Sequence, residues 1–241
     1  MRTICKVFIW KNLTIPAEGA LLEALPMMGG SVSVNDIMKR YYDNSLANMG
    51  NADSFIWYGA QWACASMAPS RGFKTWITEG GIRCPCIVRY PRAIAENAGS
   101  TTDSFSTVMD ILPTLLDLAD VPPVGEQFRN RAVVPVRGAS WAPHLRGDVS
   151  SFHDEEKEIT GWELFGLRAI RQGHWKALYM CAPRGKDRWE LYNLKDDPAE
   201  LQDLADVETQ KLETLIQHWE AYYAQTGMFD INQEFKYVKI Q

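Results

Sequence analysis

The stretch "FGLRAIRQGHWKALYM" (residues 165–180) contains two runs of alternating apolar residues that are separated by "RQGH". Alternation with a period of two predicts half-buried strands, and a short break containing glycine between two such runs predicts a β-hairpin. The stretch "RWELYNL" (188–194) predicts a third strand before the turn "KDDPAE" (195–200). We therefore expect a small antiparallel sheet near this end of the chain.

A helix is predicted after this sheet, in "DVETQKLETLIQHWEAYYAQTG" (206–227). Asp206 stands at a capping position and Gly227 marks the end of the pattern. The residues expected on one apolar face are Leu212, Leu215, Ile216, Trp219 and Tyr223. Three antiparallel strands and one helix make a small α+β unit.

A second helix is predicted in "STTDSFSTVMDILPTLLDLADVPP" (100–123), with Asp103 or Ser104 as its cap. Pro113 should either kink this helix or split it into two pieces. Its wide apolar face comprises Val108, Ile111, Leu112, Leu115, Leu116 and Leu118. This pattern favours a helix that packs against another layer.

Two further stretches resemble strands. "KVFIW" (6–10) is short and apolar, as a buried strand would be. "IRCPCIVRYP" (82–91) also predicts a strand, whose Pro85 should lie at an edge, a strand start or a bulge because proline lacks the ladder donor. Residues 122–160 are rich in loops, with one short strand predicted at 133–136. We place a domain boundary there, between residues 1–150 and residues 151–241.

The composition excludes several function classes. The 241 residues carry 25 Lys+Arg against 30 Asp+Glu, a formal charge of -5, without a block of like charge, so we expect no nucleic-acid partner. No apolar run reaches the roughly 20 residues that span a bilayer, so we expect no membrane insertion. The five cysteines are odd in number and show no zinc spacing, which favours a reducing, cytoplasmic compartment.

Five segments, in this order, resemble the C-terminal half of arylsulfatases of the formylglycine-dependent sulfatase family, within the alkaline phosphatase superfamily. They are "YGAQWACASMAPSRGFKTWITEGGIRCPCIVRYP", "VMDILPTLLDLADV", "VVPVRGASWAPHLRG", "TGWELFGLRAIRQGHWKALY" and "WELYNLKDDPAELQDLAD". The resemblance implies an α/β fold: the terminal part of a sulfatase-type mixed-sheet α/β domain, followed by a small antiparallel α+β C-terminal subdomain.

The resemblance also assigns a role to Lys74, the lysine that precedes "TEGGIR". In the family this lysine is one of the cations that neutralise the sulfate oxygens, and a fixed ammonium group would stabilise the charge that develops during sulfate hydrolysis. From the sequence alone, an ordinary solvated loop lysine is the more frequent alternative. We interpret Glu79 as a loop-ordering residue, and Gly80 and Gly81 as allowing a tight backbone approach or a positive φ.

The resemblance implies a formylglycine nucleophile and a bound Ca²⁺ or Mg²⁺ in the complete family enzyme. The one local match to the nucleophile motif is "MAPSR", in which Met67 cannot become formylglycine. The family's second metal-binding pair, Asp-Asn, aligns with Thr14 and Ile15, which are poor ligands for a hard cation. We therefore expect this chain to bind no metal, and we interpret it as an inactive fragment of a longer coding sequence.

Three other candidates are weaker. Asp43-Asn44 is an Asp-Asn pair, but capping or packing is the more frequent role for such a pair. Cys64 is interpreted as a packed thiol. Of the four histidines, only His153, which is followed by Asp154, is placed near a pocket.

Three hypotheses for the function follow. The first is a sulfuric ester hydrolase by descent, which cleaves sulfate esters to an alcohol or phenol plus sulfate and takes a small-molecule sulfate ester as substrate. The second is a non-catalytic protein that binds sulfate or another anion through Lys74. The third is an unstable fragment, whose apolar faces and strand edges would be exposed to water and would cause aggregation.

Overall fold

The computed structural model describes residues 40–55, 59–92, 94, 98–182 and 184–228. The described residues belong to two units. One contains residues 40–55 and 59–66, and the other contains the described residues from 67 to 228. The first unit holds the 3₁₀ helix η2 (Leu46–Asn48) and nearly all of the helix α3 (Gly59–Met67). The predicted strand at residues 6–10 lies outside the described residues.

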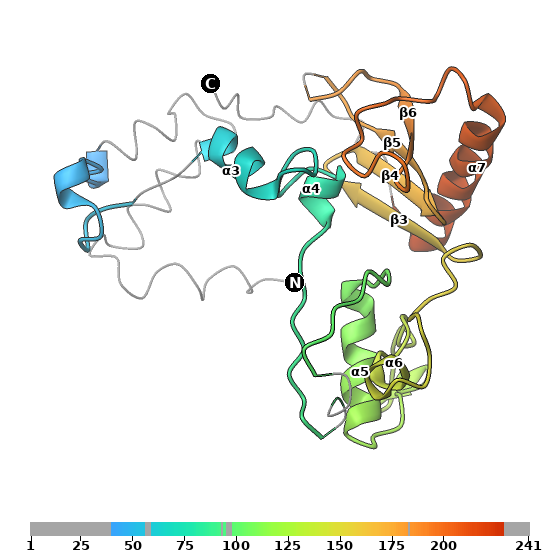
Figure 1. Cartoon of the computed structure of the whole chain (residues 1–241). Coiled ribbons are helices and arrows are strands. Elements are labelled where there is room, and N and C mark those ends of the chain that lie inside the picture. Colours follow the sequence, from blue (N-terminus) through green and yellow to red (C-terminus); the bar gives the residue numbers. More distant parts are fainter. Residues whose placement is uncertain (1–39, 56–58, 93, 95–97, 183, 229–241) are drawn as a thin grey trace. The chain divides into compact units, whose positions relative to one another are not determined.

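A four-stranded antiparallel sheet forms the centre of the second unit, in the order β3-β4-β5-β6 (Figure 1). The strands are β3 (Ile159–Leu164), β4 (Leu167–Gln172), β5 (Trp175–Tyr179) and β6 (Trp189–Asn193). The predicted hairpin is confirmed: β4 and β5 pair from Arg168↔Tyr179 to Gln172↔Trp175. The third predicted strand is confirmed as β6. β3 is an additional strand that we did not predict.

The helix α7 (Thr209–Thr226) covers one face of this sheet (Figure 1). Leu215 and Trp219 are buried against Ile170, Ala177 and Leu191, because adjacent strands present paired residues on the same face. The predicted end is confirmed, since Gly227 adopts the left-handed conformation with φ 66°.

The predicted cap of α7 was wrong. The N-cap residue is Glu208, without a side-chain capping hydrogen bond. Asp206 lies two residues further upstream, and its carboxylate accepts a hydrogen bond from Arg188 Nη1 at 3.3 Å. An acidic side chain near a helix start therefore contributes to an ion pair here instead of binding the first turn.

The opposite face of the sheet packs against the segment 71–82, which includes the short helix α4 (Glu79–Ile82). Ile77 of this segment is buried among Leu167, Ala169 and Leu178. Because alternate residues of a strand point to opposite faces, β4 and β5 supply both cores at once. The sheet therefore fixes the position of the segment that carries Lys74.

The predicted helix at 100–123 forms as two pieces, the 3₁₀ helix η3 (Val108–Asp110) and α5 (Ile111–Leu118). The predicted caps were wrong, since Thr107 caps the start by accepting a hydrogen bond from Met109 N at 3.2 Å. Pro113 is the third residue of α5, where its missing N–H has no helical partner to lose. It therefore fits into the first turn of α5, two residues after the start of this second piece.

The apolar face predicted for this helix is largely exposed to solvent. Side chains that are at least two-fifths exposed are Val108, Ile111, Leu112 and Leu115. A nearby helix, α6 (Ala142–Arg146), contacts α5 and ends at Gly147. The face therefore has an incomplete covering within the part of the chain that the structure describes.

Two strand predictions need correction. Residues 82–91 form no strand among the described residues, and Ile87 is 94% exposed. A strand is defined by its ladder partners, and none of the described segments pairs with this one. The strand predicted at 133–136 is replaced by a hairpin of β1 (Gln127–Phe128) and β2 (Arg131–Ala132).

Candidate anion-binding loop

The segment 71–82 folds back on itself through short backbone contacts. Gly80 N donates to Arg71 O at 2.8 Å, and Thr78 Oγ1 donates to the same carbonyl at 2.6 Å. Trp76 N donates to Phe73 O at 3.0 Å. Lys74 lies in the turn between these contacts, with an exposed side chain. The sequence thus places one cation at the tip of a closed loop.

Thr75, the residue after Lys74, has a left-handed backbone with φ 78°. This conformation is costly for a β-branched residue, of the order of 1–3 kcal/mol, and it persists only where the surroundings determine it. One such contact is present, because Arg184 Nη1 donates to Thr75 O at 3.4 Å. The same guanidinium lies 5.7 Å from the centre of the Trp76 ring. Arg184 therefore supports the turn that carries Lys74.

Gly80 and Gly81 are required by close backbone approach. A Cβ atom at position 80 would lie 2.5 Å from both Arg71 O and Gly72 O, and one at position 81 would lie 2.1 Å from Trp76 O. Neither glycine has a positive φ. Of the two roles that we proposed for this pair, the structure supports the first. Each glycine lets α4 lie directly on the loop backbone.

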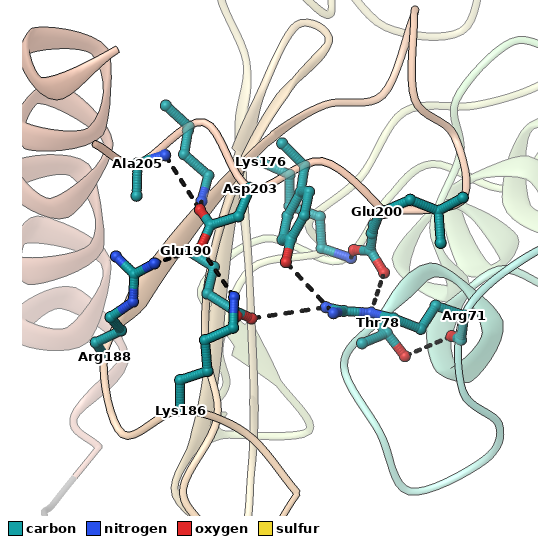
Figure 2. A network of polar contacts seen from close by, with 12 residues as sticks. Arg71, Thr78, Lys176, Lys186, Arg188, Glu190, Glu200, Asp203 and Ala205 are labelled. Atoms are coloured by element: carbon teal, nitrogen blue, oxygen red, sulfur yellow. Dashed lines mark hydrogen bonds and ion pairs between the residues drawn. The ribbon is translucent and has the colours of Figure 1, made fainter. Parts of the chain in front are cut away.

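Glu79 is buried and forms an ion pair with the sheet (Figure 2 shows its neighbours). Lys176 Nζ of β5 donates to Glu79 Oε1 at 2.8 Å and also lies 2.8 Å from Glu200 Oε1. Glu200 Oε1 accepts no hydrogen bond, so its contact with Lys176 Nζ is an ion pair alone. Glu200 Oε2 accepts from the Glu79 backbone N at 3.0 Å. These contacts agree with the interpretation of Glu79 as a loop-ordering residue.

Arg71 joins the start of the loop to the same charges (Figure 2). Its Nη1 donates to the Tyr192 hydroxyl at 3.3 Å, and its guanidinium lies 5.1 Å from the Tyr192 ring centre. Longer ion contacts reach Glu200 at 3.6 Å and Glu190 at 3.8 Å. Burial raises the pKa of Tyr192 to about 12, against the opposing effect of the Arg71 charge, so this phenol stays neutral at physiological pH.

A second cluster lies around His153, which we placed near a pocket. His153 Nε2 is 3.0 Å from Asp110 Oδ2, and its Nδ1 is 2.5 Å from Glu158 Oε2. Burial lowers the pKa of His153, but the hydrogen bonds and charges of both carboxylates outweigh it and raise that pKa overall. Burial alone would raise the pKa of Asp110, yet hydrogen bonds from His153, Thr107 and Ala139 lower it.

The cavity beside this cluster is small. It has a volume of about 10 Å³, room for about one water molecule. Its lining residues are Phe105, His153, Glu155, Glu158, Thr160, Arg171 and Gly173. Arg171 is occupied by an ion pair with Glu155. The prediction that His153 lies near a pocket is therefore confirmed, but the space is too small for a sulfate ester.

The remaining candidates have structural contacts. Asp43 Oδ1 accepts from Ser45 N at 2.9 Å, which lowers the Asp43 pKa, and Asn44 Oδ1 accepts from Phe55 N at 2.7 Å. This pair therefore binds nearby backbone amides, a structural role, although neither side chain caps a helix as we had considered. Cys64 is exposed on α3, so its interpretation as a packed thiol was wrong. Asp154 is paired with Lys157 at 2.6 Å.

No group of three or more metal-ligating side chains occurs among the described residues. Thr14 and Ile15, the positions that the family pattern assigns to the metal, lie outside them. The described residues therefore offer no set of three ligands that would hold a divalent cation.

Residues 72–225, well over half of the chain, match the family model described as N-sulphoglucosamine sulphohydrolase, C-terminal. The chain belongs to the sulfatase family. An uncharacterized sulfatase of Schizosaccharomyces pombe is 48% identical over 219 residues, which are 91% of this chain and 38% of that protein. An arylsulfatase of Klebsiella aerogenes is 30% identical over 135 residues, which are 56% of this chain and 26% of that protein.

Solved structures show the same fold. A Bacteroides thetaiotaomicron protein described with the metabolism of multiple glycosaminoglycans gives a TM-score of 0.51 at 22% identity, covering 64% of this chain and 32% of its own. Ps i-CgsB in complex with k-i-k-neocarrahexaose gives 0.50 at 20% identity, covering 70% and 39%. This sulfatase chain thus spans well under half the length of these relatives, and its α/β fold corresponds to their C-terminal region.

The family generally depends on a divalent metal. In the part of this sulfatase that the structure describes, no helix is both long enough and apolar enough to cross a membrane. The division of the chain at residue 150 stays a prediction, as does the role of Lys74.

Sequence reasoning missed Lys176, Glu190 and Glu200, which contact the loop from the sheet side. A signal for two of them was present. Lys176 alternates with Leu178 in β5, and Glu190 alternates with Tyr192 in β6, so each stands at a position of the buried face. A charged side chain on a buried row requires a partner of opposite charge, and such rows therefore predict an ion network.

Proposed function

We propose that this chain is the C-terminal part of a sulfuric ester hydrolase, and that Lys74 binds the sulfate group of a small-molecule sulfate ester. The observation that supports the proposal most is the exposure of the Lys74 side chain and its lack of a charged partner among the described residues. Lys74 is exposed at the tip of a closed loop, and its side chain has no ion pair or hydrogen bond among the described residues. The loop itself lies within the segment that matches the sulfatase family.

The chemistry favours such a cation. Cleavage of a sulfate ester to an alcohol or phenol plus sulfate develops negative charge on the leaving oxygen and on the sulfate oxygens. A positioned ammonium group stabilises that charge more in the transition state than in the ground state. In the complete enzyme, a bound Ca²⁺ or Mg²⁺ would supply further charge stabilisation. The residues of this chain would contribute the anion-binding loop.

The proposal can be tested by a graft into a longer relative. Residues 72–225 of this chain would replace the matching residues of the fission-yeast sulfatase, so that the host keeps its own residues at the positions that correspond to Thr14 and Ile15. Hydrolysis of 4-nitrophenyl sulfate would then be measured against the unmodified host. We expect turnover by the graft and a loss of about 10²–10³-fold in kcat for Lys74→Ala. Lys195→Ala, which alters another exposed turn lysine, is the matched control. Equal turnover by both variants would contradict the proposal.

The second candidate is anion binding without turnover. It is supported by the sequence at positions 14 and 15, where Thr14 and Ile15 replace the family's metal-binding pair. Under this candidate the purified 241-residue chain binds inorganic sulfate through Lys74, while 4-nitrophenyl sulfate stays intact with Ca²⁺ or Mg²⁺ present. Turnover by the chain alone, abolished by Lys74→Ala, would exclude it and would also overturn the expectation of an inactive fragment.

We also propose a cytoplasmic location. The four cysteines that the structure describes are all free thiols, which is the usual state in a reducing compartment. Fractionation of cells that express the chain, followed by thiol labelling, would test this. Recovery in a secreted fraction with blocked thiols would contradict it.

A further inference from the structure

The loop that carries Lys74 is held by charged groups that the sheet supplies (Figure 2). Lys176 stands in the middle of the sheet on β5, and Glu200 lies in the connection between β6 and α7. Both side chains are fully buried. They meet Glu79, the first residue of α4, as described above. This group of three residues, Glu79, Lys176 and Glu200, is called the clamp below.

We propose that Lys176 and Glu200 are positioning residues for the anion site: through Glu79 they fix the loop backbone from which the Lys74 side chain extends. This inference rests on the proposed function of Lys74. Neither residue would touch the substrate. Their effect would be to hold the loop in one geometry, so that the binding cation does not have to be ordered when the anion arrives.

The energetics of burial support a positioning role. Transferring charges from water into a protein interior costs several kcal/mol per ion, and apolar residues of similar volume often stabilise a core equally well. The neighbours of Lys176 on this face, such as Leu178 and Ala169, show that apolar residues fit here. Apolar side chains, however, cannot orient a backbone amide, because they accept no hydrogen bond from it. Glu200 accepts a hydrogen bond from the main chain of Glu79 and contacts Lys176 at the same time.

The charge pairing around the loop also leaves Lys74 available. Each buried carboxylate beneath the loop contacts a cation other than Lys74. These contacts are Glu79 with Lys176, Glu200 with Lys176 and Arg71, and Glu190 with Lys186 and Arg71. Because these carboxylates are already paired, they have less attraction for the Lys74 ammonium group. Among the described residues the Lys74 ammonium group has no ion-pair partner, and an incoming anion would provide one.

Hydrogen exchange separates positioning from general stability. The reporter amide is Gly80 N, which donates to Arg71 O inside the loop. The reference amide is Leu194 N, which donates to His174 O at 2.8 Å beside the sheet. Local opening of the loop lowers protection at Gly80 alone, whereas global destabilisation lowers both. The ratio of the two protection factors is therefore the measured quantity.

Two variants test the clamp in the full 241-residue chain. Lys176→Met leaves two buried carboxylates facing each other, and we expect the ratio to fall about tenfold or more. The neutral triple variant Glu79→Gln/Lys176→Met/Glu200→Gln keeps the side-chain sizes and removes all three charges of the clamp, while Arg71 keeps its contact with Glu190. We expect it to fold with a cooperative melt and to show a similar fall in the ratio, so the test survives if the single variant does not fold.

Titration with inorganic sulfate is the second readout. We expect the triple variant to bind sulfate about tenfold more weakly than the unmodified chain, because the loop must be ordered on binding. Arg188→Met is the matched control. It removes the ion pairs of Arg188 with Asp203 and Asp206, neither of which belongs to the loop, and should leave both readouts unchanged.

The outcomes distinguish this inference from the proposed function. An unchanged protection ratio and unchanged sulfate affinity in the triple variant would overturn the inference. A changed ratio with unchanged affinity would also overturn it, since the clamp would then hold the loop without serving the anion. If the unmodified chain binds no sulfate, the proposed function fails, and the ratio still decides whether Lys176 and Glu200 hold the loop.

Discussion

Replacing Gly81 by alanine sets two physical effects against each other. Gly81 lies in α4, and in a helix alanine is favoured over glycine by roughly 0.5–1 kcal/mol. The added Cβ, however, would lie 2.1 Å from Trp76 O and 2.8 Å from Phe73 O. Ordinary contacts begin at 3.4 Å. Since both neighbours are backbone atoms, the loop would have to move by about 1 Å to accept the methyl group.

The expected sign is therefore destabilising. Overpacking of this kind costs about 1–3 kcal/mol. Displacing the loop also weakens the hydrogen bonds from Gly81 N to Thr78 O and from Gly80 N to Arg71 O, each worth about 1 kcal/mol net. After the helix preference is subtracted, we expect Gly81→Ala to lower the free energy of unfolding by about 2–3 kcal/mol.

Urea denaturation followed by tryptophan fluorescence measures this change. Gly125→Ala is the matched control, because Gly125 has a negative or extended φ and a Cβ there would meet no atom within 4 Å. The control should be neutral or stabilising by up to about 1 kcal/mol. If Gly81→Ala were as stable as Gly125→Ala, the close approach of α4 to the loop would be refuted, together with our reason for the glycine pair.

Three further predictions concern other parts of the second unit. The pKa of His153 is raised and that of Asp110 is lowered, so their interaction stabilises the fold most between about pH 4 and 6.5. The melting temperature should therefore fall as the pH rises above 6.5 and as it falls below 3.8. His153→Gln should remove most of the fall in melting temperature above pH 6.5. Leu112→Gln/Leu115→Gln, on the exposed face of α5, should reduce self-association in light scattering while changing unfolding free energy by less than about 0.5 kcal/mol. Lys176→Met should lower the unfolding free energy by about 3–5 kcal/mol in urea, because it leaves the buried Glu79 carboxylate unpaired and leaves Glu200 only its longer contact with Arg71.

Each of these has a control and a contrary result. His144→Gln alters a histidine that contacts a carbonyl, and it should leave the pH profile unchanged; a flat profile in the unmodified chain would refute the His153 account. For α5, light scattering that shows the unmodified chain to be a monomer would contradict the prediction, because there would be no self-association for the substitutions to reduce. For Lys176, a loss no greater than that of the neutral triple variant would show that the buried carboxylates tolerate the missing charge.

The antiparallel sheet and α7 could be predicted because their patterns are local. The alternation in 165–180 and the apolar face of α7 each require only neighbours a few residues apart. β3 was not predicted because a glycine interrupts the alternation of apolar and polar residues in "ITGWEL". Gly161 has a packing reason, since a Cβ there would lie 2.5 Å from the Tyr222 ring of α7. That reason is visible only once the helix is docked.

The candidate site shows the same division. Lys74 was found through a resemblance of motif, and the Gly80-Gly81 pair through the known freedom of glycine. The partner of Glu79 is Lys176, 97 residues away in the sequence, and no local pattern connects the two. The strand predicted at 82–91 failed for the related reason that a strand depends on a distant partner, which the described residues do not provide.

Anion binding by Lys74 is the central step of the proposed function. The first measurement is therefore a titration of the isotopically labelled 241-residue chain with inorganic sulfate, followed by the amide shifts of residues 71–82 in Lys74→Ala and Lys195→Ala variants. We expect saturable shifts in this loop that disappear in Lys74→Ala and persist in Lys195→Ala. Shifts that are absent, or equal in the two variants, would contradict anion binding by Lys74.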